Sequence, residues 1–202
     1  SILITNFTSL AYEPYMNGKD QSWQRAHQRV DSEERRSALG NWMIRSVDGG
    51  LTFSGRYRVP VNSPHGPVQL RDGRLLYAGK ALWTEEEKVG VCESCDDGLS
   101  WQWLADIPSR KGDDHRDYHE LHAVESGDRL IVQIRNHNSD NAGETLQCES
   151  LDGGESWSEP HPIGTWGLPS HLLRLRDGRI LMSYGYRRKP FGNQVRISED
   201  EG

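Results

Sequence analysis

Residues 150–157 read Ser150-Leu151-Asp152-Gly153-Gly154-Glu155-Ser156-Trp157. The same pattern, S-x-D-x-G-x-[ST]-[FW], occurs at residues 46–53 and 94–101, and its first five positions return at residues 198–202. A pattern that returns after about 50 residues marks a repeat architecture, in which each unit is one supersecondary motif. The repeat therefore predicts a fold built from four similar units.

A second pattern lies between the copies of the first. Residues 65–76, 121–131 and 170–181 each contain a His, an apolar run, a Gly turn and a further apolar run. Two of these turns read Asp-Gly-Arg, at residues 72–74 and 177–179. An Asp-Gly pair between short apolar runs is a strong hairpin signal, because Gly tolerates the positive φ of the turn. Each unit is therefore predicted to hold four strands joined in a meander.

A four-stranded antiparallel meander repeated at this period is typical of a β-propeller blade. The expected blades cover roughly residues 1–60, 61–110, 111–164 and 165–202. Helix is expected only as a short segment at residues 31–39. The sequence thus predicts an all-β protein, a β-propeller of four-stranded antiparallel blades.

The composition excludes several classes of protein. Across 202 residues there are 24 Lys and Arg against 30 Asp and Glu, and this net charge of −6 argues against a general nucleic-acid binder. No apolar run approaches the roughly 20 residues of a membrane-spanning helix. No signal peptide is visible in the chain, and the compartment and oligomeric state stay open. The 7 Trp and 7 Tyr argue against a disordered chain.

The repeated Asp turn is identified as the Asp box, and nearly all of the chain resembles the sialidase-like Asp-box (BNR repeat) propellers. The resemblance implies a ring of six blades when complete, of which about four are expected here. The 202 residues are therefore predicted to form a single propeller domain that is a fragment of a larger closed ring, with a closed four-bladed ring as the alternative. The resemblance also implies that Asp48, Asp96 and Asp152 are structural. Residues 56–60, Arg-Tyr-Arg-Val-Pro, resemble the F-R-I-P motif of sialidases, but their place after an Asp box predicts an outer strand.

One end of the predicted propeller is rich in His and Arg, which suit the binding and protonation of an anionic or polyhydroxylated ligand. This end carries the links between blades and the loops between second and third strands. We predict Glu120 as a general acid/base, because it lies beside three His residues, and His122 or His119 could share that task. Tyr186 is predicted as a nucleophile or a stacking platform. The predicted substrate-binding residues are Arg25, His27, His65, His119, Arg135, His137, His171 and Arg187.

Together with the resemblance to sialidases, these residues predict a carbohydrate-active hydrolase, an exo-glycosidase that acts on an acidic sugar such as sialic acid. Two alternatives stay open. One is a non-catalytic propeller that binds a glycan or a protein, and the other is a polysaccharide lyase, because some propellers use His and Tyr to abstract a proton next to a uronate. The expected partner is a carbohydrate. No motif requires a cofactor or a metal, and the scattered His residues lack zinc spacing.

Overall fold

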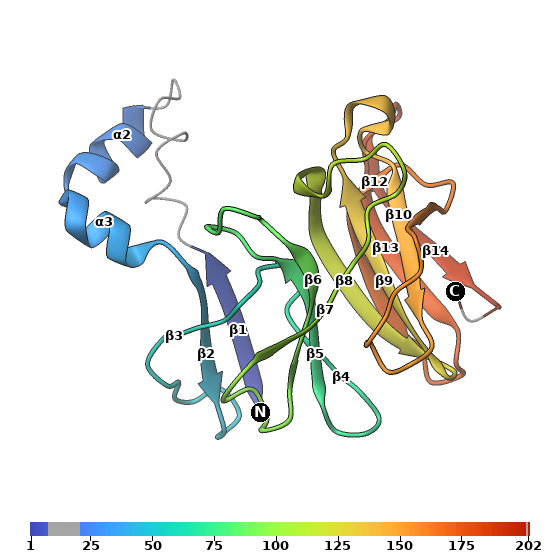
Figure 1. Ribbon diagram of the computed structural model, residues 1–202, viewed down its shortest axis with the longest axis horizontal. Coiled ribbons are helices and arrows are strands. Elements are labelled where there is room, and N and C mark those ends of the chain that lie inside the picture. The colour runs from blue at the N-terminus through green and yellow to red at the C-terminus, as the bar shows by residue number, and fades with distance from the viewer. Residues whose placement is uncertain (8–20, 201) are drawn as a thin grey trace. The chain divides into compact units, whose positions relative to one another are not determined.

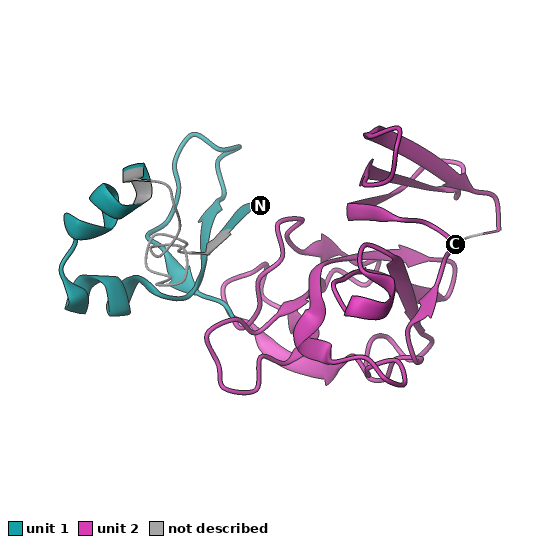
Figure 2. Ribbon diagram, turned by 90° about the horizontal axis from the view of Figure 1, so that it is seen from above, with its two compact units in different colours: residues 1–59 teal, residues 60–202 magenta. Residues whose placement is uncertain are grey.

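The computed structural model describes residues 1–7, 21–200 and 202, and the strands in this part of the chain form antiparallel β-sheets (Figure 1). Four sheets follow one another along the chain, and we number them sheet 1 to sheet 4. The chain separates into two compact units (Figure 2): residues 1–59 contain sheet 1, and residues 60–202 contain sheets 2 to 4. The prediction of an all-β fold made of antiparallel meanders is confirmed.

Sheet 1 has the strand order β1-β2-β3 and lies in the first unit. Its strands are β1 (Ile2–Phe7), β2 (Asn41–Ser46) and β3 (Tyr57–Arg58). Among the described residues between β1 and β2 there are two helices, α2 (Gln21–Gln28) and α3 (Ser32–Ala38). Helix α3 confirms the short helix expected at residues 31–39.

Helix α2 was not predicted, and the expectation that this loop lacks helix was wrong. Its sequence, QSWQRAHQ, contains three Gln, one Arg and one Ala, which favour helix locally. It has too few apolar residues to produce the 3.6-residue stripe on which the prediction relied. Local propensity therefore determines this helix, and periodicity could not detect it.

The Arg-Tyr-Arg-Val-Pro segment forms an outer strand, as predicted, because β3 pairs with β2 on the side away from β1. The Arg58 guanidinium lies 4.5 Å from the centre of the Trp42 ring and donates a hydrogen bond to the Leu39 carbonyl (3.0 Å). Arg56 lies over the same ring, at 4.4 Å. The cation–π contacts join this motif to β2, and the hydrogen bond to Leu39 ties the end of α3 to sheet 1, so the motif has a structural use here.

The second unit consists of three consecutive meanders, in which strands that follow each other in the chain also pair in the sheet. Sheet 2 contains β4 (Val68–Gln69), β5 (Leu75–Lys80), β6 (Val89–Ser94) and β7 (Gln102–Asp106). Sheet 3 contains β8 (Tyr118–Ser126), β9 (Arg129–Asn136), β10 (Thr145–Ser150) and β11 (His161–Pro162). Sheet 4 contains β12 (Gly167–Arg174), β13 (Ile180–Tyr186) and β14 (Gly192–Ser198). Two short 3-10 helices, η2 (His115–Asp117) and η3 (Ser139–Asn141), lie in the loops of sheet 3.

Apolar side chains hold these three sheets together. Strand β8 contacts both β5 and β12, so sheet 3 lies between sheets 2 and 4 (Figure 1). Burial of each large aliphatic side chain contributes about 1.5–3 kcal/mol, which makes the two inter-sheet clusters the main source of stability. The cluster between sheets 2 and 3 includes Leu76, Val91, Leu130, Leu146 and Trp157. The cluster between sheets 3 and 4 includes Val124, Ile131, Leu172, Ile180, Met182 and Tyr184.

The Asp boxes are structural turns, as predicted. In the third box, the Asp152 carboxylate accepts hydrogen bonds from the Ser156 amide, the Ser156 hydroxyl and the Ser150 hydroxyl. The bonds from Ser156 come first among those that lower the pKa of Asp152 to about 2. The same set of bonds recurs at Asp96, so each box is satisfied by its own residues.

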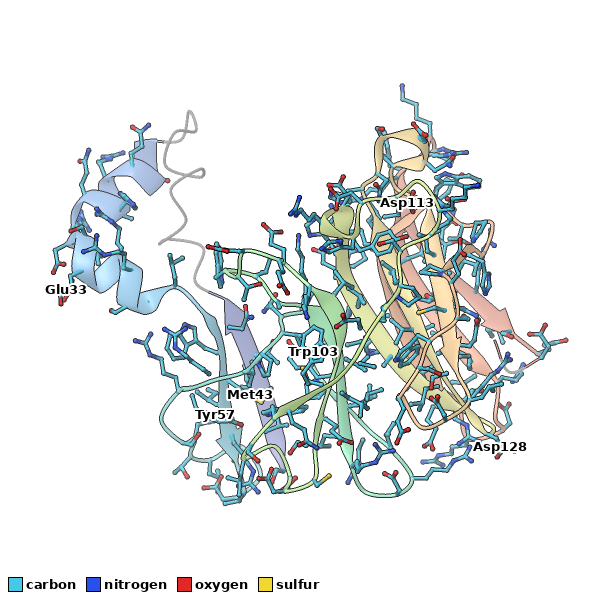
Figure 3. All side chains as sticks on the ribbon, viewed as in Figure 1. Glu33, Met43, Tyr57, Trp103, Asp113 and Asp128 are labelled. Atoms are coloured by element: carbon cyan, nitrogen blue, oxygen red, sulfur yellow. The ribbon has the colours of Figure 1, made fainter. Side chains whose placement is uncertain are left out.

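The two ends of the sheets carry different segments. Asp113, in the link that leads to β8, and Asp128, in the turn between β8 and β9, lie at opposite ends of sheet 3 (Figure 3). The strands of the four sheets fall within the ranges predicted for the four blades, while the closure of a ring stays a prediction. Within the described residues, no helix has the length and apolar character needed to cross a bilayer.

Candidate functional site

Three imidazoles from three consecutive sheets meet in the second unit, and we call them the imidazole trio. His65 precedes β4, His122 lies in β8 and His171 lies in β12. The ring centres of His122 and His171 are 4.2 Å apart in a stacked arrangement, and His65 lies 4.8 Å from His122 and 5.5 Å from His171. The structure therefore brings three predicted site residues together.

His122 forms the buried base of the trio, with 3% of its surface exposed. The backbone N–H of Leu172 donates a hydrogen bond to its Nδ1 atom (2.8 Å), so the neutral ring carries its proton on Nε2. Burial lowers the pKa of His122 to about 3, with His171 and His65 as further causes. Burial also lowers the pKa of His65 to about 4, and the partial burial of the His171 ring lowers the pKa of His171. The trio is thus neutral at pH 7, and His171 faces solvent.

The loop that carries His65 is held by buried hydrogen bonds two residues earlier. The Ser63 hydroxyl donates to the Leu121 carbonyl, which links this loop to β8. The Ser63 amide donates to the Tyr77 hydroxyl (2.9 Å), and that hydroxyl donates to the Ser63 carbonyl (2.8 Å). These contacts fix the position of His65 against sheet 3 before any ligand binds.

Glu120 lies in a β-bulge, where the register between β8 and β9 shifts between His119 and His122. Its φ is +44°, a left-handed conformation that costs a non-Gly residue roughly 1–2 kcal/mol. The bulge turns the carboxylate toward Arg135 of β9, and the two side chains form an ion pair with 30% and 23% exposure. Strained bulges of this kind are common beside active sites because they redirect a side chain.

A second pair of imidazoles flanks this ion pair. The rings of His119 and His137 lie 4.8 Å apart, and the His137 ring is exposed. Burial, followed by the nearby Lys80 ammonium, lowers the pKa of His119 to about 4. Burial also lowers the pKa of His137. Both rings are neutral at pH 7, so each offers one hydrogen-bond donor and one acceptor.

Lys80 lies near His119 in the candidate site and was not predicted from the sequence. Its side chain is buried at the end of β5, where Nζ donates to the Arg116 carbonyl (2.6 Å) and pairs with the Glu87 carboxylate (2.5 Å). The repeat contained a signal for it. Leu75 and Leu130 each pair with the first Ser of an Asp box. Lys80 and Arg135 lie five residues after them, so they occupy equivalent positions in sheets 2 and 3. Lys80 braces the loop before β8 and adds positive charge beside His119.

The remaining predicted site residues are Tyr186, Arg187, Arg25 and His27. Tyr186, at the end of β13, packs against the apolar cluster of sheets 3 and 4. Arg187 is exposed, and its backbone N–H points to the Trp166 carbonyl (3.4 Å). Arg25 and His27 lie in helix α2 of the first unit, so their participation in the site stays a prediction. Within the described residues, no group of three or more His, Cys, Asp or Glu side chains is arranged to hold a metal ion.

Comparison with solved structures places this fold among the β-propeller sialidases and arabinanases. A Dyadobacter fermentans protein of unknown function is 25% identical, with a TM-score of 0.68 over 78% of this chain and 48% of that one. An α-L-arabinanase from Penicillium chrysogenum, complexed with arabinobiose, is 19% identical, with a TM-score of 0.58 over 80% of this chain and 55% of that one. A mutant NanB sialidase from Streptococcus pneumoniae is 20% identical, with a TM-score of 0.61 over 82% of this chain and 28% of that one. The chain thus spans about half or less of the length of these proteins.

The family comparison is consistent with the Asp boxes. No curated protein matches the chain. The family model described as the BNR repeat-like domain matches residues 16–202, which is nearly the whole sequence. The protein therefore belongs to the BNR repeat-like domain family.

Proposed function

We propose that the protein is a carbohydrate-active hydrolase of the sialidase-like superfamily, an exo-glycosidase whose substrate is an acidic sugar. The observation that carries the proposal is the gathering of five imidazoles and one ion pair from three consecutive sheets. His119, Glu120 and His122 lie within four residues of β8, so this strand contributes a member to the trio, to the His119–His137 pair and to the Glu120–Arg135 pair. The fold neighbours that act on sialosides and arabinans support the same class of reaction.

Neutral imidazoles suit a sugar ligand. A neutral ring donates one hydrogen bond and accepts another, which matches the hydroxyl groups of a sugar, and it adds no charge. The cluster also changes from a buried base at His122 to exposed rings at His171 and His137. A sugar can therefore reach the outer rings while the base keeps them in place.

Arg135 and Glu120 would supply the charge and the proton. In this proposal, the sugar carboxylate binds the Arg135 guanidinium in competition with Glu120, because Arg favours planar carboxylates. On release from Arg135, the Glu120 carboxylate takes up a proton from solvent and donates it to the glycosidic oxygen as the bond to the anomeric carbon breaks. Glu120 then takes a proton from the water that adds to that carbon, and it loses this proton to solvent when the product leaves and the ion pair with Arg135 forms again.

A panel of aryl glycosides tests this proposal. We expect release of the aryl group from sialic acid or glucuronic acid glycosides, and little release from a neutral arabinofuranoside. Glu120→Gln should lower kcat at least 100-fold, because it removes the proton donor. His161→Gln is the matched control, since His161 lies on the outer strand β11 and pairs with Glu149. Equal turnover by the Glu120→Gln variant would contradict the role of Glu120.

The same panel separates the alternatives. A lyase would convert a uronate polymer into an unsaturated product that absorbs in the ultraviolet, and a binding propeller would retain a glycan without releasing anything. Tyr186→Phe tests the nucleophile or stacking role proposed for Tyr186. A nucleophile would show a loss of kcat, whereas a stacking residue would keep activity with little change in KM.

A further inference from the structure

An open pocket of about 410 Å³ lies at the end of sheet 2, where the loop between β5 and β6 meets the link from β7 to η2. We call it the link pocket. Its volume falls in the range of about 300–1,000 Å³ that is usual for small-ligand sites. Its lining combines the loop, the end of β7, the residues after β7, and η2, and it includes Lys88, Asp106, Ile107, Pro108, His115 and Arg116.

The lining of the link pocket suits an acidic sugar. The Lys88 ammonium lies 3.3 Å from the Glu86 carboxylate and 4.0 Å from that of Asp106, and all three groups are exposed. Exposed ion pairs are weak, so these groups can bind the neighbouring hydroxyls of a sugar instead. The Arg116 guanidinium is exposed, and no carboxylate of the described residues pairs with it. It is therefore free to bind a planar carboxylate through two N–H groups.

Hydrogen bonds hold the walls of the link pocket in place. The His115 Nε2 atom bonds to the Glu86 carbonyl (2.9 Å), which joins η2 to the loop between β5 and β6. The Asp114 carboxylate caps η2 by accepting from the Arg116 amide (2.9 Å). From the side of the candidate site, the buried Lys80 ammonium donates to the Arg116 carbonyl (2.6 Å). These bonds use only the backbone of Arg116, so its side chain stays available to a ligand.

The link pocket lies close to the candidate site. In an antiparallel meander the end of β5, the start of β6 and the end of β7 lie at the same end of the sheet, and Lys80 occupies that end of β5. Arg116 precedes Glu120 by four residues, so their Cα atoms are at most about 14 Å apart. Arg116 and Arg135 therefore stand near enough for one short oligosaccharide to reach both.

We propose that the link pocket is a second sugar subsite, which takes the acidic sugar next to the one bound at Arg135, so that the ligand is an oligosaccharide of acidic sugars. The carboxylate of this second sugar binds Arg116, its hydroxyls bind Lys88 and Asp106, and the C–H face of its ring packs on Pro108. The inference rests on the proposed function, because it extends the acidic-sugar ligand of the candidate site by one residue.

Titration calorimetry tests this proposal in the Glu120→Gln variant, in which turnover is blocked. The probes are the dimer of sialic acid, a disaccharide of glucuronic acid, and each of these sugars as a monomer. One of the two dimers should bind about 10-fold more tightly than its monomer, because a bond from a guanidinium to a carboxylate contributes about that factor. Addition of Arg116→Gln should remove this gain and leave the affinity for the monomer unchanged. Equal affinities for each dimer and its monomer would overturn the proposal.

Two exposed lysines provide matched variants. Lys88→Met removes an ammonium from the link pocket and should weaken binding of the dimer, whereas Lys111→Met, outside the lining, should preserve it. Tighter binding of lactose than of either acidic dimer would also overturn the proposal, because the pocket would then take a neutral sugar.

The outcome separates this subsite from the proposed function. Cleavage of acidic aryl glycosides, together with a dimer affinity that Arg116→Gln does not change, would overturn the subsite alone. Binding of a dimer that depends on Arg116, without cleavage of any glycoside, would support the subsite and overturn the hydrolase.

Discussion

Mild acid should destabilise the second unit through His122. The pKa of this buried imidazole is about 3 in the folded chain, against a reference value of 6.5. Between these two values the unfolded chain binds a proton that the folded chain excludes. The free energy of unfolding contributed by His122 is therefore fully present above pH 6.5 and decreases as the pH falls toward 3.

The size of this effect follows from the linkage between protonation and folding. A site that is protonated only in the unfolded chain costs about 1.36 kcal/mol of stability per pH unit. Between pH 6.5 and pH 5.0, His122 alone should remove about 2 kcal/mol from the free energy of unfolding. His65 and His119 have the same sign, but they are half-buried, and solvent screening makes their shares smaller.

Urea unfolding at pH 7, 6 and 5 measures this slope in the original chain and in His122→Asn. The Asn carbonyl can replace Nδ1 as the acceptor for the Leu172 amide but does not titrate. We expect the variant to be less stable at pH 7, because the smaller side chain leaves a void, and its loss between pH 6.5 and 5.0 should shrink by about 2 kcal/mol. His161→Asn, which changes an exposed ring, should keep the original slope. Parallel pH slopes for the original chain and His122→Asn would falsify the reasoning.

Three further predictions concern single features of the structure. Asp152→Ala should lower stability by about 1–2 kcal/mol, because the Ser156 amide and hydroxyl lose their acceptor, and thermal unfolding measures it. Turnover of a glycoside should stay unchanged, and a selective loss of turnover would point to a role in the site. The Glu120→Gly variant should be more stable than the Glu120→Ala variant by about 1 kcal/mol in urea unfolding, because only Gly adopts a φ of +44° without strain. A Glu120→Ala variant that is the more stable of the two would refute the strained bulge. Arg58→Ala should weaken the first unit by about 1 kcal/mol through loss of the Trp42 contact, seen as faster proteolysis of residues 1–59, and unchanged cleavage would exclude that role.

Features that depend on neighbours in the chain were predicted well. The Asp box is satisfied within eight residues, so the sequence of the box contains every group that its turn needs. The Asp-Gly-Arg turns are similar, since Gly73 and Gly178 adopt the positive φ that the hairpin requires and Asp72 accepts from the Arg74 amide. Helix α2 shows the limit of this approach, because its polar sequence follows propensity without an apolar pattern.

The imidazole trio could be predicted because the repeat supplies long-range information. His65, His122 and His171 occupy similar places in three copies of one pattern, and equivalent positions of adjacent sheets lie side by side. The bulge at Glu120 was not predictable in this way. It is an insertion in the pairing of β8 with β9, and its φ of +44° has no sequence signal, because Glu is not a residue that favours this conformation.

Differences between equivalent positions explain why the site is asymmetric. In sheets 2, 3 and 4 the first Ser of the Asp box pairs with Leu75, Leu130 and Ile180. The equivalent positions five residues later hold Lys80, Arg135 and Gly185. Two cations therefore stand on sheets 2 and 3, while sheet 4 has no side chain there, and a Cβ atom at Gly185 would lie 2.9 Å from the Leu168 carbonyl. Lys80 is buried and already paired, which leaves Arg135 as the cation of this set that a ligand can reach. A repeat makes the frame of the candidate site symmetric, and the carboxylate binding that we propose at one place requires this departure from symmetry, which occurs at Arg135 and its partner Glu120.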